Sequence, residues 1–184
     1  MSMIQKCIPD AYHASIFEIS YHSLKKQGIT TLFFDLDNTI IAYDQSELSR
    51  KEIDFISNLK KDFKIVIMSN SGYKRVSNAL KGTDFMFLWH SLKPTKIGFK
   101  KALKMVGETQ DKVMMIGDQL MTDVYGAHRL PIKVILVGSV KRSSDRGITK
   151  INRFIEKKIL KKIMRKQPKL YEERLLPYVK DHAL

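Results

Sequence analysis

Two aspartates, Asp35 and Asp37, stand two residues apart at the end of an apolar run, residues 31–37. Clustered or buried carboxylates are unfavourable unless a cation or a proton compensates their charge. A bound divalent metal is the natural companion, and ligands that are all oxygen favour Mg²⁺. For an isolated pair, a simpler explanation is that one aspartate caps a turn at Asn38 and Thr39.

A second apolar run, residues 64–68, ends in Ser69 and Asn70, whose small hydrogen-bonding side chains suit phosphate oxygens. A helix is predicted to begin just after them, and its first N–H groups would add donors for an anion. Lys93 opens another transition from loop to helix, where its amine can neutralise phosphate or pair with carboxylates. Taken singly, Ser69 is expected to cap a helix and Lys93 to lie on the surface.

A third run, residues 112–118, ends in Asp118, and Asp123 follows in the pattern GDQLMTD. Groups able to bind a phosphate or a metal therefore arrive in order at the ends of successive apolar runs. Because such an order is hard to obtain by chance, we interpret these residues as one site.

The apolar runs are short, rich in Ile, Val and Phe and apolar on both faces, as buried parallel strands are. Helix-like segments alternate with them, which predicts an α/β fold with a doubly wound parallel sheet. Ligands of such sheets lie beyond the carboxyl ends of the strands. The predicted strands are residues 31–37, 64–68, 84–89, 112–118 and 133–138. The predicted helices between them lie near residues 46–61, 73–81, 95–106 and 122–129.

Both ends of the chain lie outside this alternation. Residues 10–28 are predicted to form a helix, and residues 150–165 a second one with an apolar and a basic face. Two prolines near the C-terminus indicate a partly ordered tail over residues 167–184. The chain is thus expected to form a single domain over residues 1–166, followed by that tail.

The length of 184 residues fits one compact domain, and a hydrophobic content of 43% suffices to bury a core. A single cysteine, Cys7, excludes an intramolecular disulfide framework and a zinc site built from cysteines. A reducing cytoplasm is therefore the expected location. No apolar run approaches the roughly 18 residues that a membrane span needs. The first residues also lack the apolar segment of a secretory signal.

The basic residues are unevenly distributed. The chain carries 33 Lys and Arg against 19 Asp and Glu, a formal charge of +14. Residues 133–169 contribute +11 of this charge, and the rest of the chain contributes +3. Such a stretch favours a polyanionic partner, either nucleic acid or an anionic membrane surface. The alternative is a solvated lysine-rich helix that packs its apolar face on the sheet.

The ordered motifs resemble those of the haloacid dehalogenase (HAD) superfamily of aspartate-based phosphohydrolases. Its four motifs are matched, in order, by FFDLD, by the strand that ends in Ser69, by Lys93 and by GDQLMTD. The resemblance covers residues 30–140. It implies the HAD-like Rossmannoid fold, in which three layers surround a central parallel sheet.

A closer resemblance is to the YqeG-type branch, subclass IIIA, of this superfamily. It rests on FFDLDNTI, SNS, LKP and GDQLMTDVYGA, on residues 9–12, and on the downstream Thr149, Arg153 and Glu156. Members of the branch are regarded as similar to phosphatidylglycerophosphate phosphatases, which make phosphatidylglycerol. The resemblance therefore implies a phosphatase that acts on this lipid. A phosphatase of a soluble phosphate ester or a phosphoprotein is one alternative, and a basic RNA- or ribosome-binding module on the same fold is another.

The resemblance also implies catalytic roles. Asp35 is implied to attack phosphorus and form an aspartyl-phosphate, and Asp37 to protonate the leaving alkoxide and then to act as base toward water. Ser69 and Lys93 are implied to hold phosphoryl oxygens, with Asn70 positioning the phosphate or the substrate through its amide.

The implied cofactor is Mg²⁺, bound between Asp35, Asp118 and the backbone carbonyl of Asp37. Asp123 has two expected roles in this arrangement. It either orients a metal-bound water or pairs with Lys93.

No cap domain is expected over the site, although many superfamily members that act on small metabolites carry one. Only 31 residues separate Asp37 from Ser69, and 23 separate Ser69 from Lys93. An open site suits a large substrate such as a lipid headgroup, or a neighbouring subunit serves as the lid. We expect residues 141–166 to contact an anionic membrane peripherally, since each basic side chain near such a surface adds roughly 1 kcal/mol of attraction.

Overall fold

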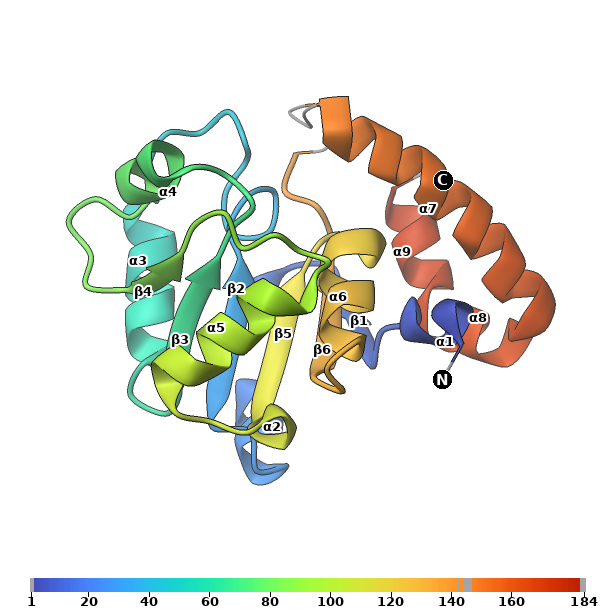
Figure 1. The fold of residues 1–184 in the computed structure, drawn as a ribbon, viewed down its shortest axis with the longest axis horizontal. Helices are drawn as coiled ribbons and strands as arrows, with labels where there is room; N and C mark the ends of the chain where they lie inside the picture. The colour runs from blue at the N-terminus through green and yellow to red at the C-terminus, as the bar shows by residue number, and fades with distance from the viewer. Residues whose placement is uncertain (1, 142, 144–146, 183–184) are drawn as a thin grey trace.

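The computed structural model describes residues 2–141, 143 and 147–182, and for residues 147–153 it describes the backbone alone. Its centre is a six-stranded parallel sheet in the order β1-β6-β5-β2-β3-β4 (Figure 1). The five strands predicted from the apolar runs are all present, and the doubly wound parallel sheet is confirmed. The strands are β1 (Ala11–His13), β2 (Thr31–Asp35), β3 (Lys64–Met68), β4 (Met86–Leu88), β5 (Val113–Gly117) and β6 (Lys133–Val137).

Helices cover both faces of the sheet, which gives the three layers expected (Figure 1). Side chains of each strand alternate between the two faces, so Phe33 packs into one apolar core and Phe34 into the other. Helices α5, α6 and α7 bury their apolar side chains on the first face, and α2, α3 and α4 on the second. The helices are α1 (Met3–Lys6), α2 (Tyr21–Lys26), α3 (Arg50–Leu59), α4 (Tyr73–Ala79), α5 (Lys96–Val106), α6 (Tyr125–His128), α7 (Gly147–Lys166), α8 (Pro168–Arg174) and α9 (Leu176–Asp181).

The connections after β2 and β3 are short. Residues 38–68, all described, contain a loop, α3 and β3, and residues 70–92 contain α4 and β4. Helix α3 begins at a capping box, in which Ser49 and Glu52 bond each other's backbone N–H. Neither connection therefore holds a cap domain.

The N-terminal segment differs from its prediction. Residues 10–28, predicted as one helix, contain β1, a 3₁₀ turn over Ile16–Glu18 and the six-residue helix α2. Asp10 fastens this segment to β6, because its Oδ2 accepts a hydrogen bond from the Val134 N–H at 2.8 Å. The Asp10 N–H in turn donates to the Val134 carbonyl at 2.9 Å. Pairing with the sheet therefore decides the structure here, and local helix propensity does not.

The C-terminal segment also differs from its prediction. Residues 167–184, predicted as a tail, form helices α8 and α9 as far as they are described. The two prolines stand in the first turns of these helices, where a missing N–H removes no intrahelical bond. Tyr178 of α9 is fully buried and donates a hydrogen bond to Glu156 of α7. Tyr12 of β1 donates to Asp181 at 2.5 Å, so the last helix is fastened to the edge strand.

Helix α7 is amphipathic, as its sequence predicts. Ile159, Leu160 and Ile163 are buried, while the lysines at positions 157, 158, 161 and 162 are exposed. Among the described residues, no helix combines the length and the apolar composition needed to cross a bilayer.

Candidate active site

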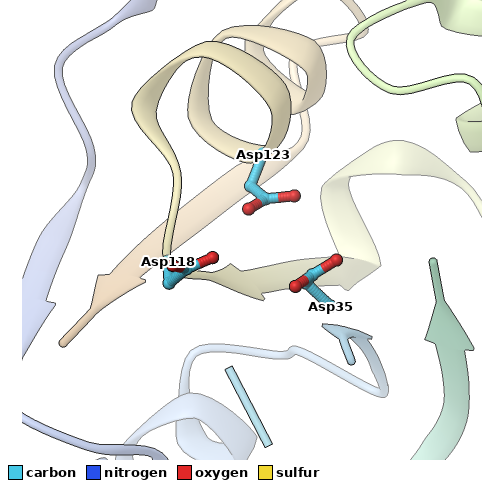
Figure 2. A group of neighbouring side chains, drawn as sticks. All are labelled: Asp35, Asp118 and Asp123. Carbon is cyan, nitrogen blue, oxygen red and sulfur yellow. The ribbon is translucent and has the colours of Figure 1, made fainter. Parts of the chain in front are cut away.

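The predicted site residues gather at the carboxyl ends of the central strands β5, β2 and β3. Asp35 is the last residue of β2, and Asp118 follows β5 directly. Asp123 lies a few residues later, in a π-helical turn over Leu120–Val124. Figure 2 shows the three carboxylates turned toward one shared space.

These three carboxylates form a compact acidic group. Each offers an oxygen, and these oxygens all lie within 4.8 Å of one another. Asp118 and Asp123 are fully buried, whereas Asp35 is 7% exposed and is therefore the member that a substrate can reach. Gly117 makes room for the group, because a Cβ at this position would lie 2.4 Å from the Cγ of Asp123. The Gln119 N–H orients Asp123 by donating to its Oδ2 at 3.1 Å.

Lys93 is buried against two of the carboxylates. Its Nζ lies 2.5 Å from the Oδ1 of Asp35 and 2.8 Å from the Oδ1 of Asp123. Burial alone would lower the pKa of Lys93, but Asp123 and Asp35 hold this pKa above its ordinary value. The amine is therefore protonated, and the structure places Asp123 in the ion pair that is one of its two expected roles.

The loop that delivers Lys93 is held by Asn70. The Nδ2 of Asn70 donates to the Lys93 carbonyl at 2.9 Å, and its Oδ1 accepts from the Lys93 N–H at 2.8 Å. The Ser91 hydroxyl donates to the same Oδ1 at 2.9 Å. Gly98 of α5 packs on this loop, since a Cβ there would lie 1.9 Å from the Ser91 carbonyl oxygen. The Asn70 amide thus binds the protein chain, and its expected contact with phosphate stays a prediction.

The carboxylate of Asp37 lies outside the acidic group of three. Its Oδ2 accepts hydrogen bonds from the hydroxyls of Ser69 at 2.9 Å and Ser71 at 2.8 Å. Its Oδ1 accepts from the Nε of Arg75 at 3.0 Å. These bonds hold the side chain of Asp37 away from the acidic group. Its role in proton transfer stays a prediction, as do a metal contact through its backbone carbonyl and a phosphate contact of Ser69.

Arg75 is the site residue that the sequence reasoning missed. Besides Asp37, its guanidinium donates to the carbonyl oxygen of Gln45 at 2.5 Å and to those of Ala42 and Ser46 at 3.3 Å. Arg75 thereby ties the loop after β2 to the second aspartate of the motif. One signal was available in the sequence, because Arg75 stands in the first turn of the helix predicted directly after the Ser69 loop.

The electrostatics of the site favour a divalent cation. Burial raises the pKa of Asp35 above its ordinary value, Lys93 opposes this effect, and the other carboxylates add to it. Burial likewise raises the pKa of Asp123 against the opposing charge of Lys93. Three carboxylates face one ammonium group here, which leaves an excess of two negative charges when all are ionised. One divalent cation would balance that excess, and three carboxylates are the donor set that Mg²⁺ accepts.

The arrangement is suited to phosphoryl transfer. The reachable carboxylate of Asp35 stands beside a protonated amine, which attracts the negative oxygens of a phosphate group. Asp37, two residues away, can give or take a proton. Arg75 and the two serine hydroxyls supply the bonds that stabilise its carboxylate.

Sequence comparisons agree with this chemistry. A family model described as mitochondrial PGP phosphatase matches residues 1–86, and one described as HAD-hydrolase-like matches residues 92–154. The probable phosphatase YqeG of Bacillus subtilis (strain 168) is 32% identical over 167 residues, which cover 90% of this chain and 96% of that protein.

Solved structures are similar at the level of the fold. A HAD family enzyme from Bacteroides thetaiotaomicron superposes with a TM-score of 0.51 at 12% identity, covering 62% of this chain and 96% of that one. A hypothetical protein from Xanthomonas campestris superposes with a TM-score of 0.51 at 10% identity, covering 69% and 75% of the two chains.

Proposed function

The chain belongs to the HAD superfamily of phosphatases, in the branch of YqeG, and we propose that it hydrolyses a phosphomonoester through Asp35 with a divalent metal. The observation that carries this proposal is the contact of Asp35 with the buried amine of Lys93 in the compact acidic group with Asp118 and Asp123. Two of these carboxylates, those of Asp35 and Asp123, contact the same amine. A divalent cation bound to the three carboxylates would offset their mutual repulsion and attract the negative oxygens of a phosphate group.

Mg²⁺ is the metal that fits this donor set best, and Asp35, Asp118 and Asp123 are the side chains able to hold it. When bound, it supplies positive charge that offsets the charge of the phosphoryl group. In this arrangement Asp123 would bind the metal directly and not through a metal-bound water, because its carboxylate belongs to the same compact group as the other two.

The protein's own residues carry the two steps of hydrolysis. An oxygen of Asp35 attacks phosphorus, and the ester bond to the leaving alkoxide breaks as the aspartyl-phosphate forms. Asp37 gives its proton to that alkoxide and then takes a proton from the water that attacks the aspartyl-phosphate, which releases phosphate and restores Asp35. Lys93 neutralises negative charge throughout, and Arg75 holds the carboxyl group of Asp37 in position through the bond from its Nε.

We propose phosphatidylglycerophosphate as the substrate. Two observations support it, namely the match of residues 1–86 to the PGP phosphatase model and the absence of a cap domain in residues 38–92. The proposal includes a cytoplasmic location with peripheral contact to an anionic membrane. The exposed lysines of α7, within the predicted contact segment 141–166, would contribute attraction to such a surface.

A substrate panel tests the proposal. The wild-type protein is assayed with Mg²⁺ against phosphatidylglycerophosphate in mixed micelles, an aryl phosphate, sugar phosphates, nucleotides and a phosphopeptide. We expect Mg²⁺-dependent hydrolysis of the aryl phosphate and the highest kcat/KM for the lipid. A higher kcat/KM for a soluble ester would overturn the lipid substrate but not the proposal that the protein is a phosphatase.

The variant Asp35→Asn tests the nucleophile. Activity should fall by at least about a thousandfold, because an amide oxygen is a far weaker nucleophile than a carboxylate. The matched control is Asp54→Asn, which changes an exposed aspartate paired with Arg50 and should leave activity unchanged. Hydrolysis that persists in Asp35→Asn would refute the proposed mechanism. Loss of hydrolysis in Asp54→Asn would mean that the loss in Asp35→Asn reflects a general loss of folded protein and not the loss of a nucleophile.

A further inference from the structure

An exposed apolar surface borders the candidate active site at the sheet edge formed by β4. We call it the aromatic rim and define it as Tyr73, Phe87, Trp89, Leu92 and Ile97. The three aromatic rings contact one another, with centroids 5.1 to 6.2 Å apart. Tyr73 is 56%, Leu92 51% and Ile97 63% exposed, and Leu92 and Ile97 follow Trp89 within eight residues of the chain.

The rim is built on the loop that delivers Lys93. His90 and Leu92 both have positive φ, 44° and 55°, a backbone conformation that residues other than glycine rarely adopt. The loop is nevertheless tightly held, since the Ser91 N–H donates to the Ser69 carbonyl at 2.9 Å. The chain therefore holds Leu92 outward and its neighbour Lys93 inward, and such strained segments cluster at functional sites.

The segments that carry the rim are rich in basic residues. Residues 69–107 contain eight Lys and Arg and a single acid, Asp84, although the chain outside residues 133–169 sums to only +3. Two of the eight, Arg75 and Lys93, are engaged in the active site. The exposed lysines nearest to the rim in sequence are Lys74, Lys96, Lys100 and Lys101, and the Nζ of Lys101 lies 5.7 Å from the centroid of the Trp89 ring.

We propose that the aromatic rim docks this protein on an anionic lipid bilayer, with its apolar side chains at the headgroup level and its lysines against the lipid phosphates. Trp and Tyr prefer this interface because their rings are amphipathic, and lysines nearby add attraction to anionic lipids. Leu92 and Ile97 have no aromatic face on which a nucleic-acid base could stack, and they suit acyl chains. A second copy of the chain would bring a like-charged lysine cluster against this one, which is unfavourable.

The substrate side of this inference rests on the proposed function. A bilayer at the rim would place a lipid phosphate beside the strand ends, because Leu92 is adjacent in sequence to Lys93, whose amine contacts Asp35. An open site then needs no cap domain, since the membrane itself covers it.

Trp89, the only tryptophan of the chain, provides the test. The full-length protein is mixed with vesicles of phosphatidylcholine alone or with phosphatidylglycerol at a third of the lipid, neither of which contains a phosphomonoester. We expect a blue shift of the tryptophan emission and quenching by brominated acyl chains with the anionic vesicles. Binding should weaken as salt is added, because the lysine contribution is screened.

The variants Leu92→Ser and Ile97→Ser keep Trp89 as the fluorescent reporter, and each removes one apolar side chain that would contact the lipid. Each should weaken the partition coefficient by about tenfold, the effect of removing one buried aliphatic side chain from a lipid contact. The matched control is Met105→Ser, which removes an exposed apolar side chain eight residues, roughly 12 Å, further along α5 and should bind as the wild type does. All three variants should hydrolyse a soluble aryl phosphate at the wild-type rate.

Three outcomes would overturn the inference. Unchanged binding of Leu92→Ser and Ile97→Ser, with binding lost when Lys157, Lys158 and Lys161 of α7 are changed to Gln, would assign the membrane contact to α7. The mass of the wild-type protein in solution could instead double as the protein concentration rises, with the rim variants staying monomeric. That result would assign the rim to contact with a second copy of the chain. Preference for single-stranded RNA over anionic vesicles would assign it to nucleic acid. Binding to these vesicles, combined with no hydrolysis of phosphatidylglycerophosphate in the micelle assay, would refute the proposed substrate but not the docking surface.

Discussion

Lys93 and Asp123 form an ion pair 2.8 Å long in which each side chain is only 1% exposed. Removing one partner of such a pair leaves an uncompensated charge in a buried site. We predict that Lys93→Met lowers the free energy of unfolding by about 3 kcal/mol and kcat/KM by about a hundredfold or more. Urea denaturation and hydrolysis of an aryl phosphate measure the two effects.

The exposed Lys96, three residues later, gives the matched control. Lys96→Met should change the free energy of unfolding by less than about 0.5 kcal/mol and leave hydrolysis of a soluble ester intact. If Lys93→Met retained activity within about threefold of wild type, the amine would have no role in binding the phosphoryl group.

Arg75 should affect turnover more than substrate binding. Its contacts reach Asp37 and the carbonyls of residues 42–46, none of which belongs to the acidic group that faces the phosphate. We predict that Arg75→Ala lowers kcat by about ten- to a hundredfold with KM within about threefold, because the proton-transferring carboxylate loses its orientation. Steady-state kinetics on a soluble ester separate the two parameters.

A conservative variant distinguishes positioning from general stability. Arg75→Lys keeps the positive charge and one donor for Asp37, so it should recover part of kcat, whereas both variants lose the carbonyl contacts. Equal loss of kcat in both, together with an equal fall in thermal stability, would indicate that Arg75 only holds the loop.

The sequence predicted the parts of the site that follow from strand ends. Asp35, Ser69 and Asp118 each end an apolar run, and parallel strands bring their carboxyl ends to one edge of the sheet. The prediction therefore needed only the strands, not the details of packing. The sequence left two roles open for Asp123, and the structure shows the ion pair with Lys93 that one of them describes.

Other features depend on contacts that no local pattern records. The hydrogen bonds between the Asn70 amide and the Lys93 backbone, 23 residues away, are one example. Strand β1 pairs with β6, and the neighbouring Asp10 accepts a bond from Val134, 124 residues away. The excess of basic residues in residues 69–107 was not predicted. Acids elsewhere outside residues 133–169 reduce the net charge of that part of the chain to only +3.

Asp10 should make stability depend on pH in the acidic range. Burial alone would raise its pKa, but bonds from His128 and the Val134 N–H, with the charge of Arg174 nearby, hold the pKa below its ordinary value. A lowered pKa in the folded state means that the carboxylate stabilises the protein above about pH 4 and that this contribution is lost as the pH falls further. Asp10→Asn should therefore be less stable than wild type at pH 6, with the difference shrinking toward pH 3.5.

Urea midpoints at several pH values measure this difference. Asp44→Asn is the matched control, because Asp44 is an exposed aspartate paired with Lys141 and its surface pair should contribute little at any pH. A stability difference between wild type and Asp10→Asn that stays constant from pH 6 to pH 3.5 would mean that the Asp10 carboxylate is not the stabilising form.

Gly117 should control metal binding although it offers no ligand side chain. A Cβ at this position would lie 2.4 Å from the Cγ and 2.5 Å from the Oδ2 of Asp123, so Gly117→Ala must displace that carboxylate. We predict that Mg²⁺ affinity, measured by calorimetric titration, weakens by at least about tenfold, as it does when groups that orient ligands are removed. Gly72→Ala is the matched control, because its Cβ would meet His90 at an ordinary 3.4 Å and its φ of −72° suits alanine. Undiminished Mg²⁺ affinity in Gly117→Ala would show that Asp123 is dispensable for the metal and serves Lys93 alone.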